Sequence, residues 1–343
     1  MERLDRRVKS ADGENLNVHF VNSTQTLPGH LRGGVVAIGN FDGVHRGHQA
    51  LLARAQEIAA REGKPWGVVT FEPHPRSFFR PEQPVFRLTP PDLKLRLINA
   101  LSAGFASVVN FDAKLAALSA EEFVRQELIQ KLGASHVVAG FDFHFGAGRK
   151  GHADTLRSMG LTVTTVEEVT DEGAGHLPFS SSTIREALRQ GQLKHAAHEL
   201  GYDWMIEGTV VPGDQRGRSI GFPTANIIVE QGVEPARGIY ATFVREAGKP
   251  APLWLGAGYF GDRPTFNTNR TFFEVYLLDQ SLDLYGRRLL VQFVELIRPD
   301  QSFTSVEALI SQMKNDCEAA RKILAVHDVA DFPLARLQAA GKV

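Results

Sequence analysis

The stretch VVAIGNFDGVHRGHQALL, Val35–Leu52, decides the fold of the N-terminal half. It opens with a continuous apolar run, passes through a glycine-containing turn, and continues into a segment of helical character. A short apolar run without alternation is typical of a strand buried on both faces of a parallel sheet. We therefore predict a strand, a tight turn and a helix, the repeating unit of an open α/β domain.

The same pattern recurs along the first half of the chain. Further β-rich runs are WGVVTF from Trp66, ASVVNF from Ala106, SHVVAG from Ser135 and LTVTTV from Leu161. Helix-like segments separate them, which predicts parallel strands joined by right-handed crossovers. Ligands in such sheets bind beyond the carboxyl ends of the strands.

Capping signals mark two of the intervening helices. Thr89 followed by Pro90 predicts an N-cap and a first-turn proline. Ser119 with Glu122 predicts a capping box, and Gly133 is the expected stop of that helix.

The residue composition and the spacing of strand-like runs change after about residue 202. Glycine, proline and threonine become frequent, and strand-like runs follow closely: MIEGTVV, GIYATFVRE, APLWLGAGYF, RTFFEVYLLD and RLLVQFVELI. This predicts an antiparallel sheet or small β-barrel. An amphipathic helix from about Ser305 to Ala325 should close the domain, with Val306, Leu309, Ile310 and Met313 on one face.

Two domains are expected from these patterns. We predict an α/β domain over residues 16–186, connecting helices over 187–202 and a barrel domain over 203–330, preceded by a disordered extension of about 15 residues.

Composition excludes several classes of protein. The 343 residues are 43% hydrophobic and carry a formal net charge of −1, which gives no electrostatic reason to expect a nucleic acid or an anionic membrane as partner. A single cysteine, Cys317, excludes an internal disulfide. We expect no transmembrane helix, no signal peptide and, by default, a cytoplasmic protein. The oligomeric state, a homo-oligomer included, stays open.

His45 and His48 are the first candidate functional residues. They stand three residues apart where the predicted turn meets its helix, whose N–H groups and dipole favour phosphate. An imidazole there can donate a hydrogen bond to an α-phosphate as charge develops. A zinc pair completed by His74, His144 or His152 is one alternative. Two surface histidines are another.

The turn resembles the HxGH signature of the nucleotidylyltransferase superfamily. Downstream, TFEPHPRSFF (Thr70–Phe79), GFDFHFGAGRKG (Gly140–Gly151) and FSSSTIREAL (Phe179–Leu188) follow in order. Together they resemble the FAD synthetase module of bacterial bifunctional riboflavin kinase/FAD synthetases, which implies a Rossmann-like domain. The resemblance implies an ATP site formed by Asn40, Asp42, His45, His48, Asp142, Ser181, Ser182 and Arg185, with both histidines catalytic.

Structural alternatives exist for these motifs. The serines of Ser180–Ser182 are compatible with a helix cap alone, and FEPHP with a rigid strand exit. The chain also departs from the family at His144, where arginine is frequent, and at Ser182, where threonine is frequent.

A second candidate site lies in GTVVPGDQRGRSIGFPTANI, Gly208–Ile227. Its glycines and arginines suit a loop that wraps phosphate, although it is not a GxxxxGK[ST] loop. Thr224 and Asn226 stand two residues apart, so they share one face of a strand. Both offer oxygen ligands of the kind that Mg²⁺ prefers. Ordinary turn chemistry is the alternative for both.

This segment resembles the riboflavin kinase domain. The likeness continues through GDRPTF (Gly261–Phe266), FFEVYLLD (Phe272–Asp279) and LYGRRLLVQFVELIRP (Leu284–Pro299). It implies Glu274 as the catalytic carboxylate that accepts the riboflavin 5′-hydroxyl proton; an outward-facing strand glutamate is the alternative. It implies ATP or flavin binding by Gly213, Arg216, Gly217, Arg218, Gly221, Thr224, Asn226 and Arg263, with Mg²⁺ on Thr224 and Asn226. Tyr259 and Phe260 depart from the family pattern.

The two resemblances imply one bifunctional enzyme. It would phosphorylate riboflavin to FMN with ATP, and then adenylylate FMN to FAD with release of pyrophosphate. Two rival hypotheses are a flavin or nucleotide carrier without activity, and an adenylyltransferase acting on nicotinamide mononucleotide or phosphopantetheine. The second rival hypothesis does not explain why the chain also has a barrel domain.

Overall fold

The computed structural model describes residues 19–21, 25–171, 177–213, 216–229, 232–247, 251–261 and 272–327, without the side chains of Arg216 and Arg218. The described chain forms two compact units. The first holds residues up to Val85 and Pro91–Ser180; the second holds Phe86–Pro90 and the residues from Ser181 onward. The predicted N-terminal extension lies outside the described residues.

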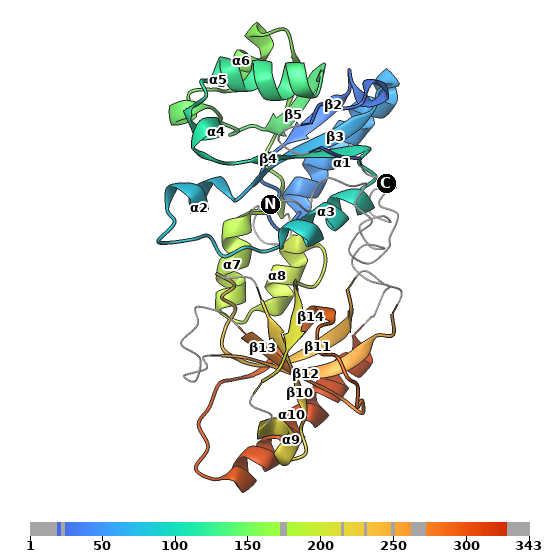
Figure 1. Cartoon of the computed structure of the whole chain (residues 1–343), viewed down its shortest axis with the longest axis vertical. Coiled ribbons are helices and arrows are strands. Elements are labelled where there is room, and N and C mark those ends of the chain that lie inside the picture. Colours follow the sequence, from blue (N-terminus) through green and yellow to red (C-terminus); the bar gives the residue numbers. More distant parts are fainter. Residues whose placement is uncertain are drawn as a thin grey trace. The chain divides into compact units, whose positions relative to one another are not determined.

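Strands and helices alternate in the first unit (Figure 1). Its elements are β1 (His19–Val21), η1 (Gly29–Leu31), β2 (Val35–Ile38), α1 (Arg46–Glu62), β3 (Trp66–Glu72), α2 (Pro75–Phe79), α3 (Pro91–Ala100), β4 (Phe105–Asn110), α4 (Ala113–Ala117), α5 (Ala120–Phe123), η2 (Val124–Lys131), β5 (His136–Gly140), η3 (Ala147–Arg149), α6 (Ala153–Ser158), β6 (Thr162–Val166), β7 (Thr170–Asp171) and β8 (Leu177–Pro178).

The first unit is built on a parallel sheet of order β1-β4-β3-β2-β5-β6 in the described chain. The five predicted strands are confirmed, and every pair in this sheet is parallel. Sequence analysis missed β1, which at three residues is too short to show a period. The chain builds outward from β2 in one direction and from β5 in the other, so the topological switch point lies between β2 and β5. Ligands bind at such points in open α/β sheets.

Helices cover both faces of this sheet. Helix α1 contacts β2, β3 and β5 through one face that buries Leu52, Ala55 and Ile58. Phe123 and Leu128, from the predicted capping-box helix, share a core with alternate strand residues. The Ser119–Glu122 box is confirmed, and Gly133 adopts a φ of +64° after that helix. Helix α3 starts at Pro91, one residue later than expected.

The second unit contains two helices followed by a closed barrel. Its elements are α7 (Ser181–Arg189), α8 (Leu193–Leu200), β9 (Met205–Val211), α9 (Arg216–Ser219), β10 (Thr224–Ile228), β11 (Gly238–Glu246), β12 (Trp254–Phe260), β13 (Phe272–Leu277), β14 (Arg288–Pro299) and α10 (Val306–Val326). The barrel order is β10-β13-β12-β11-β14-β9, antiparallel throughout. The predicted barrel is therefore confirmed.

The barrel strands use both of their faces. The buried ring of Phe293 contacts the buried rings of Tyr240 and Phe273. Alternate residues on the other face, such as Phe243, pack with Ala320 and Leu324 of α10, which lies against β11, β12 and β14. The predicted closing helix is confirmed as α10, with Ser305 as its N-cap, whereas Val306 is 54% exposed.

Candidate active sites

The turn after β2 has an unusual backbone. Phe41, Gly43 and Val44 have φ angles of +49°, +82° and +38°. Such angles cost about 1–3 kcal/mol each for residues other than glycine and persist only where the surroundings enforce them. Alternation of ordinary and left-handed residues is the backbone pattern of anion-binding nests. The turn lies at the carboxyl end of β2, beside the switch point.

The two candidate histidines meet at the end of this turn. His45 takes the N-cap position of α1, and its ring stacks on that of His48 with centroids 3.7 Å apart. Phe41 packs edge-on against His48 at 5.3 Å. His45 and Asp42 are buried, at 6% and 5% exposure. The predicted group of Asp42, His45 and His48 is therefore brought together at a helix N-terminus, where anions are stabilised.

The zinc alternative gains no support. The side chain of His74 caps α2, that of His152 caps α6, and His144 Nδ1 lies 2.7 Å from the carbonyl oxygen of Asp142. No cluster of three or more potential His, Cys, Asp or Glu ligands occurs among the described residues.

Asp142 follows β5, on the other side of the switch point. Its side chain is exposed, and the neighbouring Phe143 and Phe145 stack at 5.5 Å. Phe145 also packs against Phe123 in the core. The aromatic residues of this motif therefore anchor the loop that carries Asp142. Next to the loop is a cavity of about 180 Å³, whose lining includes His144 and His152.

Ser181, Ser182 and Arg185 belong to α7, in the second compact unit. Ser180 precedes the helix, and Ser181 and Ser182 are its first two residues. Arg185 is 8% exposed, and its Nε donates to the carbonyl oxygen of Phe86 at 2.6 Å. This contact gives Arg185 a structural task within its own unit. A phosphate contact by these three residues stays a prediction.

The second site is a row of side chains across three barrel strands. Asn226 on β10 stands opposite Glu274 on β13, which stands opposite Tyr259 on β12. Thr224 shares the face of Asn226, and its Oγ1 donates to Glu274 Oε2 at 3.3 Å. Glu274 lies on the face opposite to the buried Phe273, so it does point out of the barrel interior, as the structural alternative assumed. That outer face is not open surface, because it lines a cavity.

The glycine loop folds onto the strand that bears Thr224 and Asn226. A Cβ on Gly213 would lie 2.3 Å from Asn226 Nδ2, and one on Gly217 would lie 2.3 Å from the carbonyl oxygen of Phe222. Gly221 has a φ of +90°. Only glycine permits these approaches. Arg216 and Arg218 lie on α9 without described side chains, and Arg263 lies outside the described residues.

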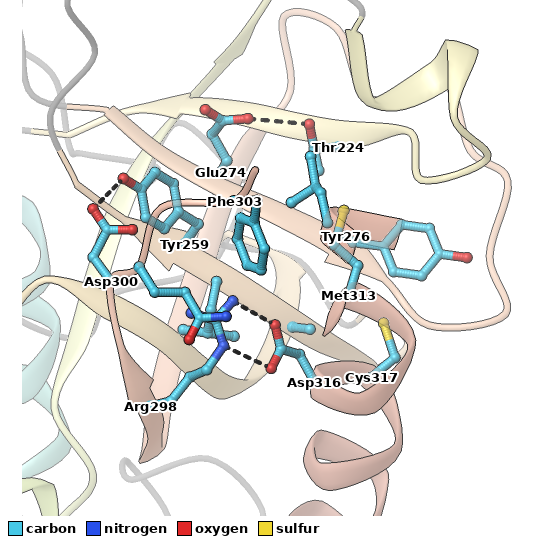
Figure 2. A pocket seen from close by; sticks show the side chains of 14 residues that line it. Thr224, Tyr259, Glu274, Tyr276, Arg298, Asp300, Phe303, Met313, Asp316 and Cys317 are labelled. Atoms are coloured by element: carbon cyan, nitrogen blue, oxygen red, sulfur yellow. Dashed lines mark hydrogen bonds and ion pairs between the residues drawn. The ribbon is translucent and has the colours of Figure 1, made fainter. Parts of the chain in front are cut away.

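A cavity of about 280 Å³ extends from Glu274 to α10 (Figure 2). Thr224 and Glu274 form one polar end. Its lining residues are Thr224, Ile239, Ala257, Tyr259, Glu274, Tyr276, Arg298, Asp300, Gln301, Phe303, Leu309, Met313, Asp316 and Cys317. A mostly apolar chamber with a few polar groups is typical of a small-molecule site.

Tyr259, one of the two departures from the family pattern, forms a hydrogen bond with Asp300. Its hydroxyl donates to Asp300 Oδ2 at 3.0 Å, on the cavity wall (Figure 2). Phe260, the second departure, is buried at 7% exposure.

Sequence analysis missed the ion pair that fixes α10 to the barrel. Arg298 donates from Nε and Nη2 to the two carboxylate oxygens of Asp316, at 2.9 and 2.8 Å (Figure 2). Gln312 Nε2 donates to the same carboxylate at 2.9 Å. One signal was present: Asp316 is a charged residue in line with Met313 and Ala320 on the apolar face of α10. Such a residue needs a partner.

We predict that Asp316→Ala destabilises the second unit by about 3–5 kcal/mol, because it leaves a largely buried guanidinium without its carboxylate. The Michaelis constant of any ligand of the cavity should rise as α10 loosens. Denaturant unfolding monitored by tryptophan fluorescence, to which the buried Trp204 of this unit contributes, measures the stability change.

Asp279→Ala is the matched control. Asp279 also binds α10, through Arg321, but this pair is exposed. An exposed pair contributes little to stability. Equal destabilisation by the two variants would contradict the role assigned to Arg298 and Asp316.

Cys317 forms part of the same cavity wall. Burial, reinforced by the neighbouring negative charge of Asp316, raises the pKa of its thiol to about 11. The thiol is therefore protonated near neutral pH and serves as a small apolar surface.

Comparison with known proteins finds a match for each half of the chain. A family model described as FAD synthetase matches residues 27–182, and one described as riboflavin kinase matches residues 200–324. Two curated relatives carry the name bifunctional riboflavin kinase/FMN adenylyltransferase. That of Escherichia coli strain K12 is 39% identical over 84% of this chain and 92% of its own length. That of Pseudomonas fluorescens is 41% identical over 90% of this chain and 98% of its own length.

A solved structure has the same fold along the chain. It is titled a macrolide-efflux protein from Streptococcus pneumoniae, and it superposes with a TM-score of 0.77 at 30% identity. The match covers 89% of this chain and 99% of that one. No helix in the described part of this chain is long and apolar enough to cross a membrane.

Proposed function

The chain belongs to the bifunctional riboflavin kinase/FMN adenylyltransferase family, and we propose that each compact unit performs one of its two reactions. The first unit joins FMN to the AMP part of ATP, at the turn of His45 and His48. The second phosphorylates riboflavin at Glu274. The single observation that best supports the kinase assignment is that Asn226 stands opposite Glu274 and Thr224 donates a hydrogen bond to it, at the end of a chamber suited to a flavin.

In the kinase reaction, Glu274 accepts the proton of the riboflavin 5′-hydroxyl. The hydroxyl oxygen attacks the γ-phosphorus of ATP, the bond from that phosphorus to the β,γ-bridging oxygen breaks, and ADP leaves. Thr224 orients the carboxylate through their hydrogen bond. Tyr259, Tyr276 and Phe303 provide aromatic walls for the flavin ring. Phosphoryl transfer requires little beyond positioning and neutralisation of charge.

Mg²⁺ fits the oxygen donors at this site. Thr224 offers a hydroxyl and Asn226 an amide oxygen from one strand face, beside the Glu274 carboxylate. Mg²⁺ binds such ligands together with phosphate oxygens and waters. Bound there, it would neutralise phosphate charge. Gly213 leaves room for this amide, because a Cβ there would lie 2.3 Å from Asn226 Nδ2.

We predict that Asn226→Ala lowers the rate of FMN formation about 10- to 100-fold, because a ligand contact to a charged group is worth about 1.5–3 kcal/mol. The Mg²⁺ concentration needed for half-maximal rate should rise. FAD formation from supplied FMN should not change. Titration of Mg²⁺ in both assays measures the effect, and an unaltered Mg²⁺ requirement would contradict the ligand assignment.

In the adenylyl-transfer reaction, a phosphate oxygen of FMN attacks the α-phosphorus of ATP directly. The bond to the bridging oxygen of pyrophosphate breaks, and pyrophosphate leaves without a covalent enzyme intermediate. His45 and His48 donate to phosphate oxygens that gain charge, and the N-terminus of α1 adds its N–H groups. Asn40 and Asp42 shape the turn. Asp142 belongs to the ATP site in this proposal, and phosphate contacts by Ser181, Ser182 and Arg185 remain a prediction.

Product analysis tests the proposal. Purified protein with ATP and Mg²⁺ should convert riboflavin to FMN and then FAD, and should convert supplied FMN to FAD. Absence of both products would contradict it. The same proposal assigns residues 16–186 to adenylyl transfer, 203–330 to the kinase and 187–202 to the connecting helices, in a cytoplasmic enzyme.

A further inference from the structure

Lys94 is a buried lysine in the first unit that no predicted motif includes. It lies on α3, and its side chain is 5% exposed. A lysine is almost never buried unless its charge is paired. Its surroundings therefore identify what the ammonium group does.

The ammonium group binds three oxygens at the carboxyl edge of the sheet. Nζ donates to Glu72 Oε1 at 2.6 Å, to Thr70 Oγ1 at 3.2 Å and to the carbonyl oxygen of Asn40 at 3.3 Å. An ammonium group has three donors, so each finds an acceptor. Glu72 ends β3, and Asn40 follows β2. Lys94 thus ties α3 to the ends of two adjacent strands.

The contact to Asn40 fixes the main chain at the start of the turn between β2 and α1, which carries His45 and is here called the phosphate turn. The same carbonyl oxygen accepts a second hydrogen bond, from Thr70 Oγ1 at 3.0 Å, and Thr70 is fully buried. The next residue, Phe41, already has a left-handed backbone, as does Val44 just before His45. Strained residues persist only where their neighbours hold them. The two hydrogen bonds to the Asn40 carbonyl oxygen, from Lys94 and Thr70, are such a restraint.

Stability alone does not account for this arrangement. A buried ion pair is often replaceable by apolar side chains of similar volume without loss of stability. We propose that Lys94 is a positioning residue for adenylyl transfer, which holds the Asn40 carbonyl so that the turn presents His45 and His48 to ATP. This inference rests on the site proposed above for the first unit.

Lys94→Met tests the proposal in the full chain. Displacement of the turn by about 1 Å should lower kcat/KM for FAD formation about 100-fold and raise the KM for ATP. Riboflavin phosphorylation by the same preparation should not change. Lys131→Met is the matched control, since Lys131 also forms a largely buried pair with a glutamate, Glu127, but precedes β5 at the opposite edge of the sheet. Equal effects of Lys94→Met and Lys131→Met would overturn the proposal.

Two further variants separate positioning from folding. In a His48→Ala background, adding Lys94→Met should lower the rate of FAD formation by less than about threefold, because both residues act through one turn. A further loss as large as that caused by Lys94→Met alone would overturn the proposal. Lys94→Met with Glu72→Leu removes the pair without burying a lone carboxylate. This variant should remain defective in FAD formation, and recovery of the wild-type rate would overturn the proposal. Wild-type protein that makes no FAD would instead refute the proposed function.

Discussion

Glu274→Gln is expected to lower kcat for riboflavin phosphorylation about 10³-fold, within the range for loss of a general base. Glutamine keeps the size of the side chain and its hydrogen bond with Thr224. It cannot accept the 5′-hydroxyl proton. The KM for riboflavin should change little, because the cavity walls are intact. Steady-state assays of FMN formation measure both parameters.

The control for this variant is another strand glutamate in the same unit. Glu295 on β14 pairs with the exposed Lys194, so Glu295→Gln should leave the kinase unaffected. FAD formation from supplied FMN should also proceed at the wild-type rate in Glu274→Gln. If kinase turnover were retained, Glu274 would be only an outward-facing strand residue, and another group would have to accept the hydroxyl proton.

His48→Ala is expected to lower kcat for FAD formation about 10²- to 10³-fold. This is the usual cost of removing one donor that stabilises developing charge. FMN formation should continue, so FMN should accumulate when riboflavin is supplied. Chromatographic separation of riboflavin, FMN and FAD over time measures both steps in one reaction.

His30→Ala is the control for the histidine variant, because His30 lies exposed on η1 in the same unit. It should leave both activities unchanged. Equal loss of FMN and FAD formation in His48→Ala would contradict the assignment of the turn to adenylyl transfer alone.

Much of the fold is predictable from local patterns. The strands of the first sheet are continuous apolar runs, and the barrel strands are closely spaced runs between glycines. The turn between β2 and α1 is predictable too, because glycines between a strand and a helix indicate a tight turn that leads to a helix N-terminus, where phosphate binds. Thr224 and Glu274 differ: alone they look ordinary, and the resemblance to riboflavin kinases supplied most of the argument. Their hydrogen bond now supports them independently of that resemblance.

The remaining features depend on tertiary contacts between distant segments. Lys94 and Asn40 are 54 positions apart, and neither Thr70 nor Glu72 indicates their meeting. The sequence of α10 predicts its amphipathic character but not that Leu309 and Met313 face a cavity. An outward orientation of Glu274 is what the structural alternative predicts. It is compatible with catalysis because α10 roofs the outer face of the barrel.

The central claim is that one chain carries two separable sites, and mixing two variants tests it most directly. Glu274→Gln alone should make almost no FMN from riboflavin, and His48→Ala alone should stop at FMN. Because FMN can diffuse from one molecule to the other, an equimolar mixture with ATP and Mg²⁺ should form FAD from riboflavin. A mixture that forms no FAD, although each variant retains its other activity, would contradict the account.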